Sequence, residues 1–291
     1  MFSYDEAFDR NIGWVTAAEQ RILAGKRVAI AGLGGVGGAH LLTLTRLGVG
    51  SFNIADFDSF EVHNFNRQSG ANIHSVGRAK LEVMVEMASS INPDLRFAKF
   101  AEGVHSGNAE RFLDGVDLYV DGLDFFVFEE RQRLFSICAE RRIPAITVAP
   151  LGMGAALLVF LPGRMTFEEY FQMGSRSELE KAARFLVGLT PSMLQVGYLV
   201  DPARVDLAAR KGPSTVMACE LCAGIAATEA LKILLGRGRV LAAPRGLHFD
   251  AYKNRLRRTW RPGGNANPVQ RLLITLATRR FAGASKEKDR P

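Results

Sequence analysis

Three polar residues that can bind anions or hydroxyl groups, Asn64, Arg67 and Gln68, lie close together in the segment EVHNFNRQSG. The planar guanidinium of an arginine grips phosphate oxygens through two parallel N–H donors, and the two amides can bind ribose or phosphate oxygens without adding charge. Lys80, in the first turn of a predicted helix, adds a second cation. Alone, an arginine and a lysine are most often solvated surface residues. Together they are typical of a site that neutralises a triphosphate as pyrophosphate leaves.

A glycine-rich turn precedes these residues. Gly32, Gly34 and Gly37 form the pattern Gly-x-Gly-x-x-Gly between an apolar strand, RVAIAG, and a helix predicted for residues 35–47. The glycines allow a tight turn and a close approach of phosphates, and the helix N-terminus favours their negative charge. Asp56 follows 19 residues after Gly37, at the end of the next strand, where a carboxylate can accept from ribose hydroxyls. The combination predicts nucleotide binding but does not say which nucleotide; glycines that merely turn the chain are the alternative.

Two carboxylates, Asp121 and Asp124, follow a further apolar strand in the segment VDGLDFF. The carboxyl ends of parallel strands are where such sheets bind ligands. A carboxylate pair that faces a triphosphate predicts a Mg²⁺ site. The alternative is that both acids cap the helix that follows.

The apolar runs predict the elements that position these residues. RVAIAG, SFNIAD, DLYVDG and AITVAP are typical of buried parallel strands, with helices at residues 35–47, 75–93 and 127–141 between them. GAALLVFLPG and RGLHFDAY are predicted as later, antiparallel strands, and a long helix begins after Pro213 and ends at a glycine. The predicted fold class is α/β, a Rossmann-like doubly wound sheet that is parallel in the N-terminal half with antiparallel additions in the C-terminal half.

The predicted organisation has five parts. Residues 163–212 interrupt the strand–helix rhythm and are predicted to be an inserted crossover that forms a lid or a substrate surface, with a helix begun by a capping box of Ser175 and Glu178. The parts are an N-terminal helical arm (1–25), a Rossmann-like ATP-binding part (26–162), the insertion (163–212), a helix and strand that complete the domain (213–252), and a basic tail (253–291).

The charge of the chain is concentrated in this tail. Residues 251–291 hold eleven of the 37 basic residues and two of the 30 acidic ones, so the rest of the chain is close to neutral. The tail is predicted to contain a Pro/Gly/Asn linker, a short amphipathic segment and a disordered charged end. An anionic membrane, RNA and an acidic partner are all candidates to contact it, and a solvated extension without a partner is the alternative.

Composition narrows the cellular setting and the metal chemistry. The N-terminus, MFSYDEAFDR, has no signal-peptide pattern, and the longest apolar run, GAALLVFL, is far shorter than the roughly 18–20 residues that cross a bilayer. A cytoplasmic location is therefore predicted. Of three cysteines, Cys219 and Cys222 form one Cys-x-x-Cys, which is two ligands short of a structural zinc site, so no zinc is expected. Cys138 lies in an apolar helix and is predicted to be a core residue.

The order and spacing of these motifs resemble the ThiF/MoeB/HesA family, the bacterial relatives of ubiquitin-activating enzymes. The resemblance rests on the glycine turn, ADFDSFEVHNFNRQ, VGRAK and Asp-x-x-Asp, and covers roughly residues 8–160 and the helix at 214–237. It implies Mg-ATP as the nucleotide and adenylation of a carboxylate, often the C-terminus of a small protein or peptide, with release of pyrophosphate.

The resemblance also implies roles for individual residues. Asp56 matches the family's ribose-binding aspartate, and Asp124 matches the aspartate associated with magnesium. Arg10 stands where relatives carry an arginine that reaches the ATP site of a partner subunit, which implies a homodimer. The implied catalytic residues are Arg67, Lys80, Asp124 and Arg10, and the implied nucleotide contacts are Gly32, Gly34, Gly35, Gly37, Asp56, Asp58, Asn64, Gln68 and Asp121.

Three departures from the family pattern shape the predicted function. Phe125 replaces the asparagine that often follows the second aspartate, and Arg131 lies further along its helix than the usual arginine. The chain also lacks paired zinc cysteines and a crossover cysteine. The prediction is therefore an adenylyltransferase without a cysteine thioester step. A non-catalytic nucleotide-binding module is the main alternative, followed by an NAD-dependent oxidoreductase, which would leave Arg67 and Lys80 without a task.

Overall fold

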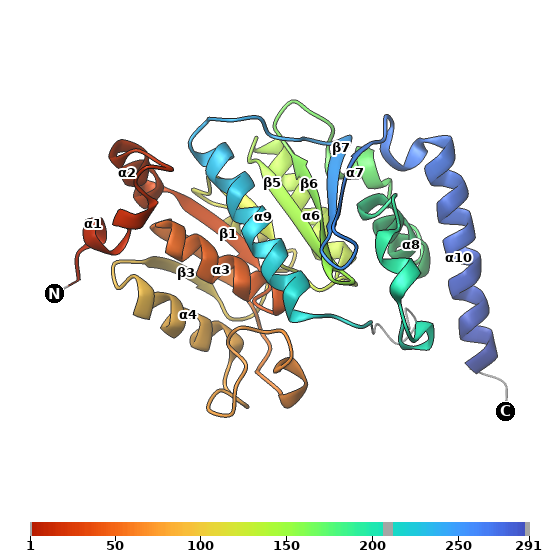
Figure 1. Cartoon of the computed structure of the whole chain (residues 1–291), viewed down its shortest axis with the longest axis horizontal. Coiled ribbons are helices and arrows are strands. Elements are labelled where there is room, and N and C mark those ends of the chain that lie inside the picture. Colours follow the sequence, from red (N-terminus) through yellow and green to blue (C-terminus); the bar gives the residue numbers. More distant parts are fainter. Residues whose placement is uncertain (1, 206–211, 289–291) are drawn as a thin grey trace.

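A single mixed sheet runs through the protein. The computed structural model describes residues 2–205 and 212–288, with side chains up to residue 279. Eight strands hydrogen-bond in the order β3-β2-β1-β4-β5-β6-β7-β8 (Figure 1). This order places β1 between β2 and β4, which is the point where a doubly wound sheet changes direction and binds its ligands.

The parallel half of the sheet confirms the predicted fold class. Its strands are β1 (Arg27–Ala31), β2 (Ser51–Ala55), β3 (Arg96–Phe100), β4 (Leu118–Asp121) and β5 (Ala145–Leu151). β1 and β2 are almost wholly buried and apolar, as parallel strands covered on both faces must be. The helices that connect these strands are α3 (Gly35–Leu47), α4 (Lys80–Ile91), α5 (Ala109–Phe112) and α6 (Phe128–Glu140).

The antiparallel half of the sheet also matches the prediction. It contains β6 (Gly154–Phe160), β7 (Arg245–Asp250) and β8 (Arg255–Trp260). β5 and β6 form a hairpin in which Leu151 pairs with Gly154, and Gly154 in turn pairs with Asp250 of β7. One edge of the sheet is therefore formed by the C-terminal ends of the parallel strands β1, β4 and β5. The end of β7 and the start of β8 lie at the same edge.

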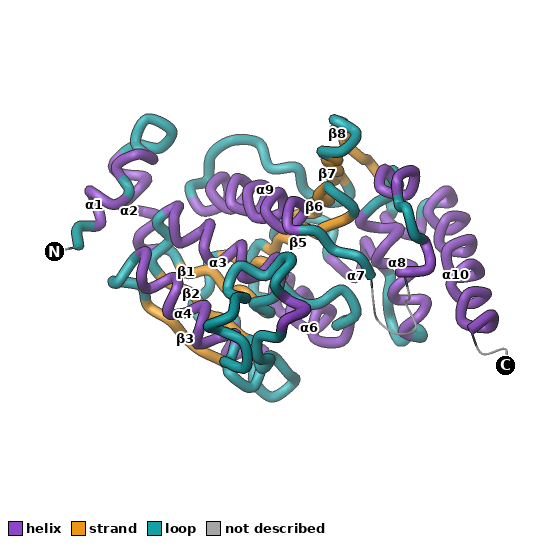
Figure 2. Tube along the Cα trace, turned by 60° about the horizontal axis from the view of Figure 1, so that its bottom comes forward, coloured by secondary structure: helices purple, strands orange, loops and turns teal. Residues whose placement is uncertain are grey.

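Two apolar layers cover the two faces of the sheet. α3, α4 and the long helix α9 (Val216–Leu234) pack on one face, around a core that includes Ile30, Leu41 and Ala226. α5 and α6 pack on the other face together with α7 (Phe167–Phe171) and α8 (Glu178–Leu189). Figure 2 shows α6, α7 and α8. The glycine turn thus lies at the edge of a rigid three-layer structure.

The N-terminal arm packs beside the opposite edge. It contains α1 (Tyr4–Ala7), η1 (Asp9–Asn11) and α2 (Ala17–Gly25), and α2 leads directly into the start of β1. The Tyr4 hydroxyl donates to the Gly48 carbonyl at 2.6 Å, which fixes the arm to the end of α3.

The segment predicted as an insertion contributes to the core instead of lying over it as a flap. Phe167, Tyr170, Phe171 and Phe185, from α7 and α8, are buried against the sheet. The helix α8 also begins later than predicted, because the Ser177 hydroxyl, and not that of Ser175, accepts from the Glu180 amide. Short helices η3 (Leu194–Tyr198) and η4 (Pro202–Arg204) follow. Residues 206–211 of the predicted insertion lie outside the described residues.

The predicted basic tail is largely part of the folded domain. The boundary at residue 252 falls inside the β7–β8 hairpin, and β8 was not predicted as a strand. After η5 (Gly264–Ala266), α10 (Pro268–Lys288) packs on α8 through the buried Gln270 and Ile274. The charged end predicted to be disordered is helical as far as Lys288, and residues 289–291 lie outside the described chain. None of the described helices combines the length and apolarity that a bilayer crossing needs.

Candidate functional site

The glycine turn is packed too tightly for any other residue type at two positions. Gly32 follows β1 directly with a φ of +83°, and a Cβ added there would lie 2.4 Å from the Gly122 carbonyl oxygen. A Cβ on Gly37 would lie 1.8 Å from the Gly32 carbonyl oxygen. The turn, the first residues of α3 and the end of β4 are thereby held in direct contact, with the N-terminus of α3 directed at the turn.

Asp56, at the end of β2, fixes the shape of this turn. Its Oδ2 accepts from the Leu33 amide at 2.7 Å, and its Oδ1 accepts from the Asp58 amide at 2.8 Å. Burial raises the pKa of this carboxyl, and the two backbone hydrogen bonds oppose that shift. Each carboxylate oxygen has two lone pairs, so both oxygens can still accept from a ligand hydroxyl.

Asn64 organises the loop that follows β2. Its side chain is buried, and its Oδ1 accepts from the Glu61 amide at 2.9 Å. Its carbonyl oxygen accepts from the amides of Arg67 and Gln68 at 3.1 and 3.0 Å. These bonds wind the loop into one tight turn, which places the side chains of Arg67 and Gln68 beside the glycine turn.

Arg67 and Gln68 lie against the N-terminus of α3. The Cγ of Arg67 is 3.5 Å from where a Cβ on Gly35 would stand, and the Nε2 of Gln68 is 3.7 Å from the same position on Gly34. The Gln68 Oε1 is buried without a hydrogen-bond partner. The Arg67 guanidinium donates to the Asn66 Oδ1 at 2.9 Å and to the His63 carbonyl at 3.2 Å. The side chain of a cationic residue, the Nε2 donor of Gln68 and a helix N-terminus thus meet at one place, which is a suitable site for a phosphate chain.

Lys80 and Asp58 form an ion pair beside this loop. The Lys80 Nζ donates to the Asp58 Oδ2 at 2.9 Å, and the lysine is only 6% exposed. The Lys80 amide also donates to the Asp58 carbonyl at 2.9 Å. An ammonium group has three donors, so the paired Lys80 keeps donors for a ligand.

The two acids at the end of β4 have different surroundings. Asp121 is 4% exposed, and its Oδ2 accepts from the Arg131 Nε at 2.8 Å and from the Thr147 hydroxyl at 3.0 Å. Asp124 is exposed, and its Oδ1 accepts from the Phe126 amide at 3.0 Å. The structure therefore does not bring Asp121 to the open side of the site with Asp124. The predicted nucleotide contact from Asp121 is replaced by an internal ion pair.

Arg131 shapes the Asp124 loop, a role that the sequence interpretation missed. Besides its bond to Asp121, its guanidinium donates to the backbone carbonyls of four loop residues, and it stacks 4.6 Å from the centre of the Phe185 ring. The four carbonyls belong to Leu123, Asp124, Phe125 and Val127. Phe125, the residue that departs from the family pattern, packs on the same Phe185 ring with centroids 5.2 Å apart.

Arg10 is not brought to this site within one chain. It lies in η1 with its side chain exposed, and the arm that carries it sits where β1 begins and not where β1 ends. Only an Arg10 from a second copy could join the glycine turn, so its role stays a prediction.

The cysteines are buried thiols. Cys138 lies in the core, as predicted, and Cys219 of α9 lies beside the glycine turn. Burial raises the pKa of the Cys219 and Cys222 thiols. Among the side chains that the structure describes, at residues 2–205 and 212–279, no three His, Cys, Asp or Glu are grouped as metal ligands would be. The expectation that zinc plays no part stays a prediction.

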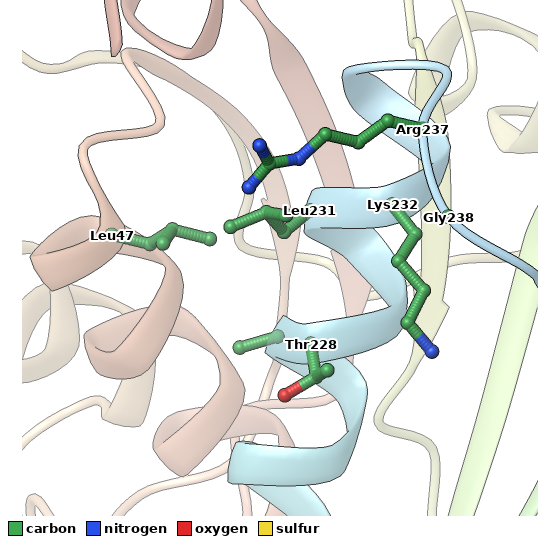
Figure 3. Close-up of a pocket in the computed structure, with 7 residues that line it drawn as sticks. Leu47, Thr228, Leu231, Lys232, Arg237 and Gly238 are labelled. Carbon is green, nitrogen blue, oxygen red and sulfur yellow. The ribbon is translucent and has the colours of Figure 1, made fainter. Parts of the chain in front are cut away.

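A hollow of about 480 Å³ lies between the C-terminal ends of α3 and α9, and it is separate from the site. Leu47 and Leu231 point toward one another across it, with Thr228, Lys232 and Arg237 at its rim (Figure 3). A 13-residue helix is about 20 Å long, so the hollow is nearly that distance from the glycine turn at the start of α3.

Comparison with known proteins identifies the family. The family model described as "ThiF family" matches residues 8–271. The chain belongs to the ThiF family. This membership confirms the resemblance inferred from the sequence motifs.

Relatives within the family differ in what their names say they do. The tRNA threonylcarbamoyladenosine dehydratase of Escherichia coli (strain K12) is 31% identical over 133 residues, which cover 45% of this chain and 49% of the relative. The sulfur carrier protein ThiS adenylyltransferase of the same organism is 28% identical over 143 residues, covering 49% of this chain and 56% of the relative. The ThiF-family chain spans about half the length of the curated relatives that it matches first.

A solved structure confirms the fold. E. coli MccB with AMPCPP and MccA superposes with a TM-score of 0.69 at 18% identity, over 92% of this chain and 75% of MccB. The shared Rossmann-like architecture, with its antiparallel C-terminal strands, is therefore a property of this ThiF-family protein.

Proposed function

We propose that this protein is an ATP-dependent adenylyltransferase that activates a carboxylate as an acyl-adenylate and releases pyrophosphate. One observation carries the proposal: the Arg67 side chain and the Gln68 Nε2, a hydrogen-bond donor, lie against Gly35 and Gly34 at the N-terminus of α3. The two phosphates of NAD need only the glycine turn and the helix N-terminus. An added cation at that place suits the longer, more charged chain of ATP.

The residues around the turn have distinct tasks in this proposal. Asp56 accepts from the ribose hydroxyls, Asn64 holds the loop in its wound form, and Arg67 with Lys80 neutralises the phosphates. A carboxylate oxygen of the substrate bonds to the α-phosphorus, and the bond from that phosphorus to the oxygen of the leaving pyrophosphate breaks. The nucleophile is already ionised near neutral pH, so the reaction needs no general base. Catalysis consists of alignment and charge neutralisation.

Asp124 fits the position of a magnesium-binding carboxylate. Mg²⁺ at nucleotide sites is usually held by one or two carboxylates together with substrate phosphates. Asp124 offers one exposed carboxylate at the same sheet edge as the glycine turn, whereas the ion pair with Arg131 removes Asp121. When bound there, Mg²⁺ supplies positive charge to the phosphate chain.

Named relatives support adenylation as the reaction. One matching protein is a ThiS adenylyltransferase, and MccB, of similar fold, has been crystallised with ATP. MccB has also been crystallised with MccA. By analogy, we propose a peptide or protein C-terminus, or a small acid, as the activated group, and a homodimer in which Arg10 of one copy joins the site of the other.

The proposed reaction stops at the adenylate or passes it to an acceptor other than an enzyme thiol. A thioester step needs an accessible thiolate. All three cysteines are buried, and burial raises the pKa of each thiol.

ATP–pyrophosphate exchange tests the proposal. The protein is assayed with labelled pyrophosphate and fractions of a lysate from the source organism, and the stimulating fraction is resolved by mass spectrometry. Arg67→Ala and Asp124→Ala should each lower the exchange by about two orders of magnitude, as expected for the loss of one preorganised charge contact. Arg271→Ala, a change of an exposed arginine on α10, is the control and should leave it unchanged. Unaltered exchange in both site variants would contradict the assigned roles.

A non-catalytic nucleotide-binding module is the second candidate. Two observations favour it: Phe125 turns inward to pack on Phe185, and Asp58 already neutralises Lys80. ATP binding without pyrophosphate exchange over a broad set of carboxylates would support this candidate over the transferase.

A further inference from the structure

The strand β8 forms an open edge of the sheet. It pairs with β7 from Arg245↔Trp260 to Asp250↔Arg255, and no other strand of the described chain pairs with it. Of the described elements, only β7 packs extensively against it. Figure 2 shows the β7–β8 hairpin projecting beyond the helices. A row of backbone N–H and C=O groups is therefore available for another extended chain.

The side chains of β8 give this edge a strong positive charge on both faces. Arg255 and Arg257 share one face, and Arg258 lies on the other face with Leu256 and Trp260, because side chains alternate along a strand. Residues 251–279 contain seven basic and no acidic residues. The acid opposite Arg255 on β7, Asp250, is buried and accepts from the Tyr198 hydroxyl at 2.8 Å.

Arginines on an edge strand can also serve only to prevent aggregation. The opposite edge of the sheet, β3, is of that protected kind: it is half-buried, and its Lys99 pairs with Glu82 at 3.3 Å. β8 differs because Leu256 and Trp260 are 54% and 59% exposed beside the arginines. A strand that exposes apolar side chains next to unpaired backbone N–H and C=O groups is better suited to binding a partner than to preventing aggregation.

We propose that β8 binds an extended acidic peptide, which adds to the sheet as a further strand antiparallel to β8. Backbone hydrogen bonds along the edge provide affinity, and alternate carboxylates of the peptide meet Arg255 and Arg257. A second copy of this protein is a poor occupant, because pairing β8 with β8 would place arginines opposite arginines.

The direction of β8 connects this docking edge to the candidate site, and this step rests on the proposed function. β8 begins at the same edge of the sheet at which β4 ends and after which Asp124 follows, four strands away. A peptide antiparallel to β8 leaves the sheet at that edge with its C-terminus leading. A strand added outside β8 lies five strand spacings from β4, about 24 Å, which about seven extended residues can span. The docked peptide would thus present its terminal carboxylate to the nucleotide.

Fluorescence anisotropy without any nucleotide tests the docking. The probe is a labelled peptide of about fourteen residues that alternates Glu with Thr, enough to pair with β8 and reach the site. The parent protein should bind it, and Arg255→Glu/Arg257→Glu should weaken binding by at least about tenfold. Arg271→Glu/Arg279→Glu on α10 changes the net charge equally and should leave binding within about twofold. Equal losses in the two double variants would overturn the proposal.

A second probe separates strand pairing from charge attraction. The same peptide, N-methylated at alternate amides, keeps its carboxylates but cannot form the backbone ladder, and it should bind at least about tenfold more weakly. Equal binding of the two peptides would overturn the proposal. The proposal would also be overturned if the β8 arginines bound oligouridine RNA or phosphatidylserine vesicles while the acidic peptide did not bind. Docking that fails to stimulate pyrophosphate exchange would uphold β8 as a docking edge and count only against adenylation.

Discussion

Replacing Arg131 by methionine should be among the most damaging single substitutions in this protein. Arg131 is 1% exposed and binds the Asp121 carboxylate together with four backbone carbonyls. The variant Arg131→Met leaves the carboxylate buried with only the Thr147 and Tyr119 hydroxyls and the Leu123 amide as donors. Breaking a buried ion pair in this way costs about 3–5 kcal/mol. That loss is a large fraction of the stability of a typical domain.

Urea unfolding followed by far-UV circular dichroism measures this loss. Arg133→Met is the matched control on the same helix, because Arg133 pairs with Glu129 at 3.3 Å in an exposed position and should contribute less than about 1 kcal/mol. The double variant Asp121→Asn/Arg131→Met removes the buried charge as well, so its loss should be smaller than the sum of the single losses. Similar free energies of unfolding for the Arg131 and Arg133 variants would refute the reasoning.

His40 is buried with no hydrogen-bond partner for either ring nitrogen, and this burial lowers its pKa from 6.5 to about 4. The unfolded chain therefore binds the proton more readily than the folded protein. The free energy of unfolding should fall as the pH drops from 6.5 toward 4. Between pH 7 and 4.5 the parent should lose about 2 kcal/mol more than His40→Leu in urea titrations, and parallel pH profiles would contradict this. Gly37→Ala should abolish nucleotide binding, because its Cβ would overlap the Gly32 carbonyl. Gly224→Ala, on the exposed face of α9, is the control: its Cβ would meet nothing within 4 Å, and it should stabilise the folded protein by about 0.5–1 kcal/mol. Calorimetric titration with ATP checks the Gly37→Ala variant, and thermal unfolding checks Gly224→Ala. Tight ATP binding by Gly37→Ala would show that the glycine turn is not the nucleotide site.

The parts of the fold that depend on local pattern were predictable from the sequence. β1 and α3 follow from a continuous apolar run, a glycine turn and a helical stripe, and α3 spans the predicted residues. The edge strands β3 and β8 were missed, because RFAKF and RLRRTW place charged residues among apolar ones over only a few positions. What makes these segments strands is pairing with a neighbour that is distant in sequence, and that pairing has no local signal.

In the candidate site, too, the residues that belong to local motifs were predictable and those that depend on tertiary packing were not. The motifs located Asp56, Arg67 and Gln68, which converge on the glycine turn. They did not reveal that Asp121 faces inward, because the ion pair that holds it depends on how α6 packs. A signal was present nevertheless: Arg131 falls at helical spacing on a stripe that is otherwise apolar, between Phe128 and Phe135. A charged residue on a buried helix face requires a buried partner of opposite charge.

The central claim is that Arg67 holds the phosphate chain of a nucleotide at the glycine turn. Calorimetric titration of the parent protein and of Arg67→Ala with ATP and with AMP, both in magnesium buffer, tests it most directly. The parent should bind ATP at least about tenfold more tightly than AMP, because only ATP extends to the guanidinium, and the variant should lose that preference while still binding AMP. Equal affinity of the parent for ATP and AMP, or an unchanged preference in Arg67→Ala, would contradict the claim.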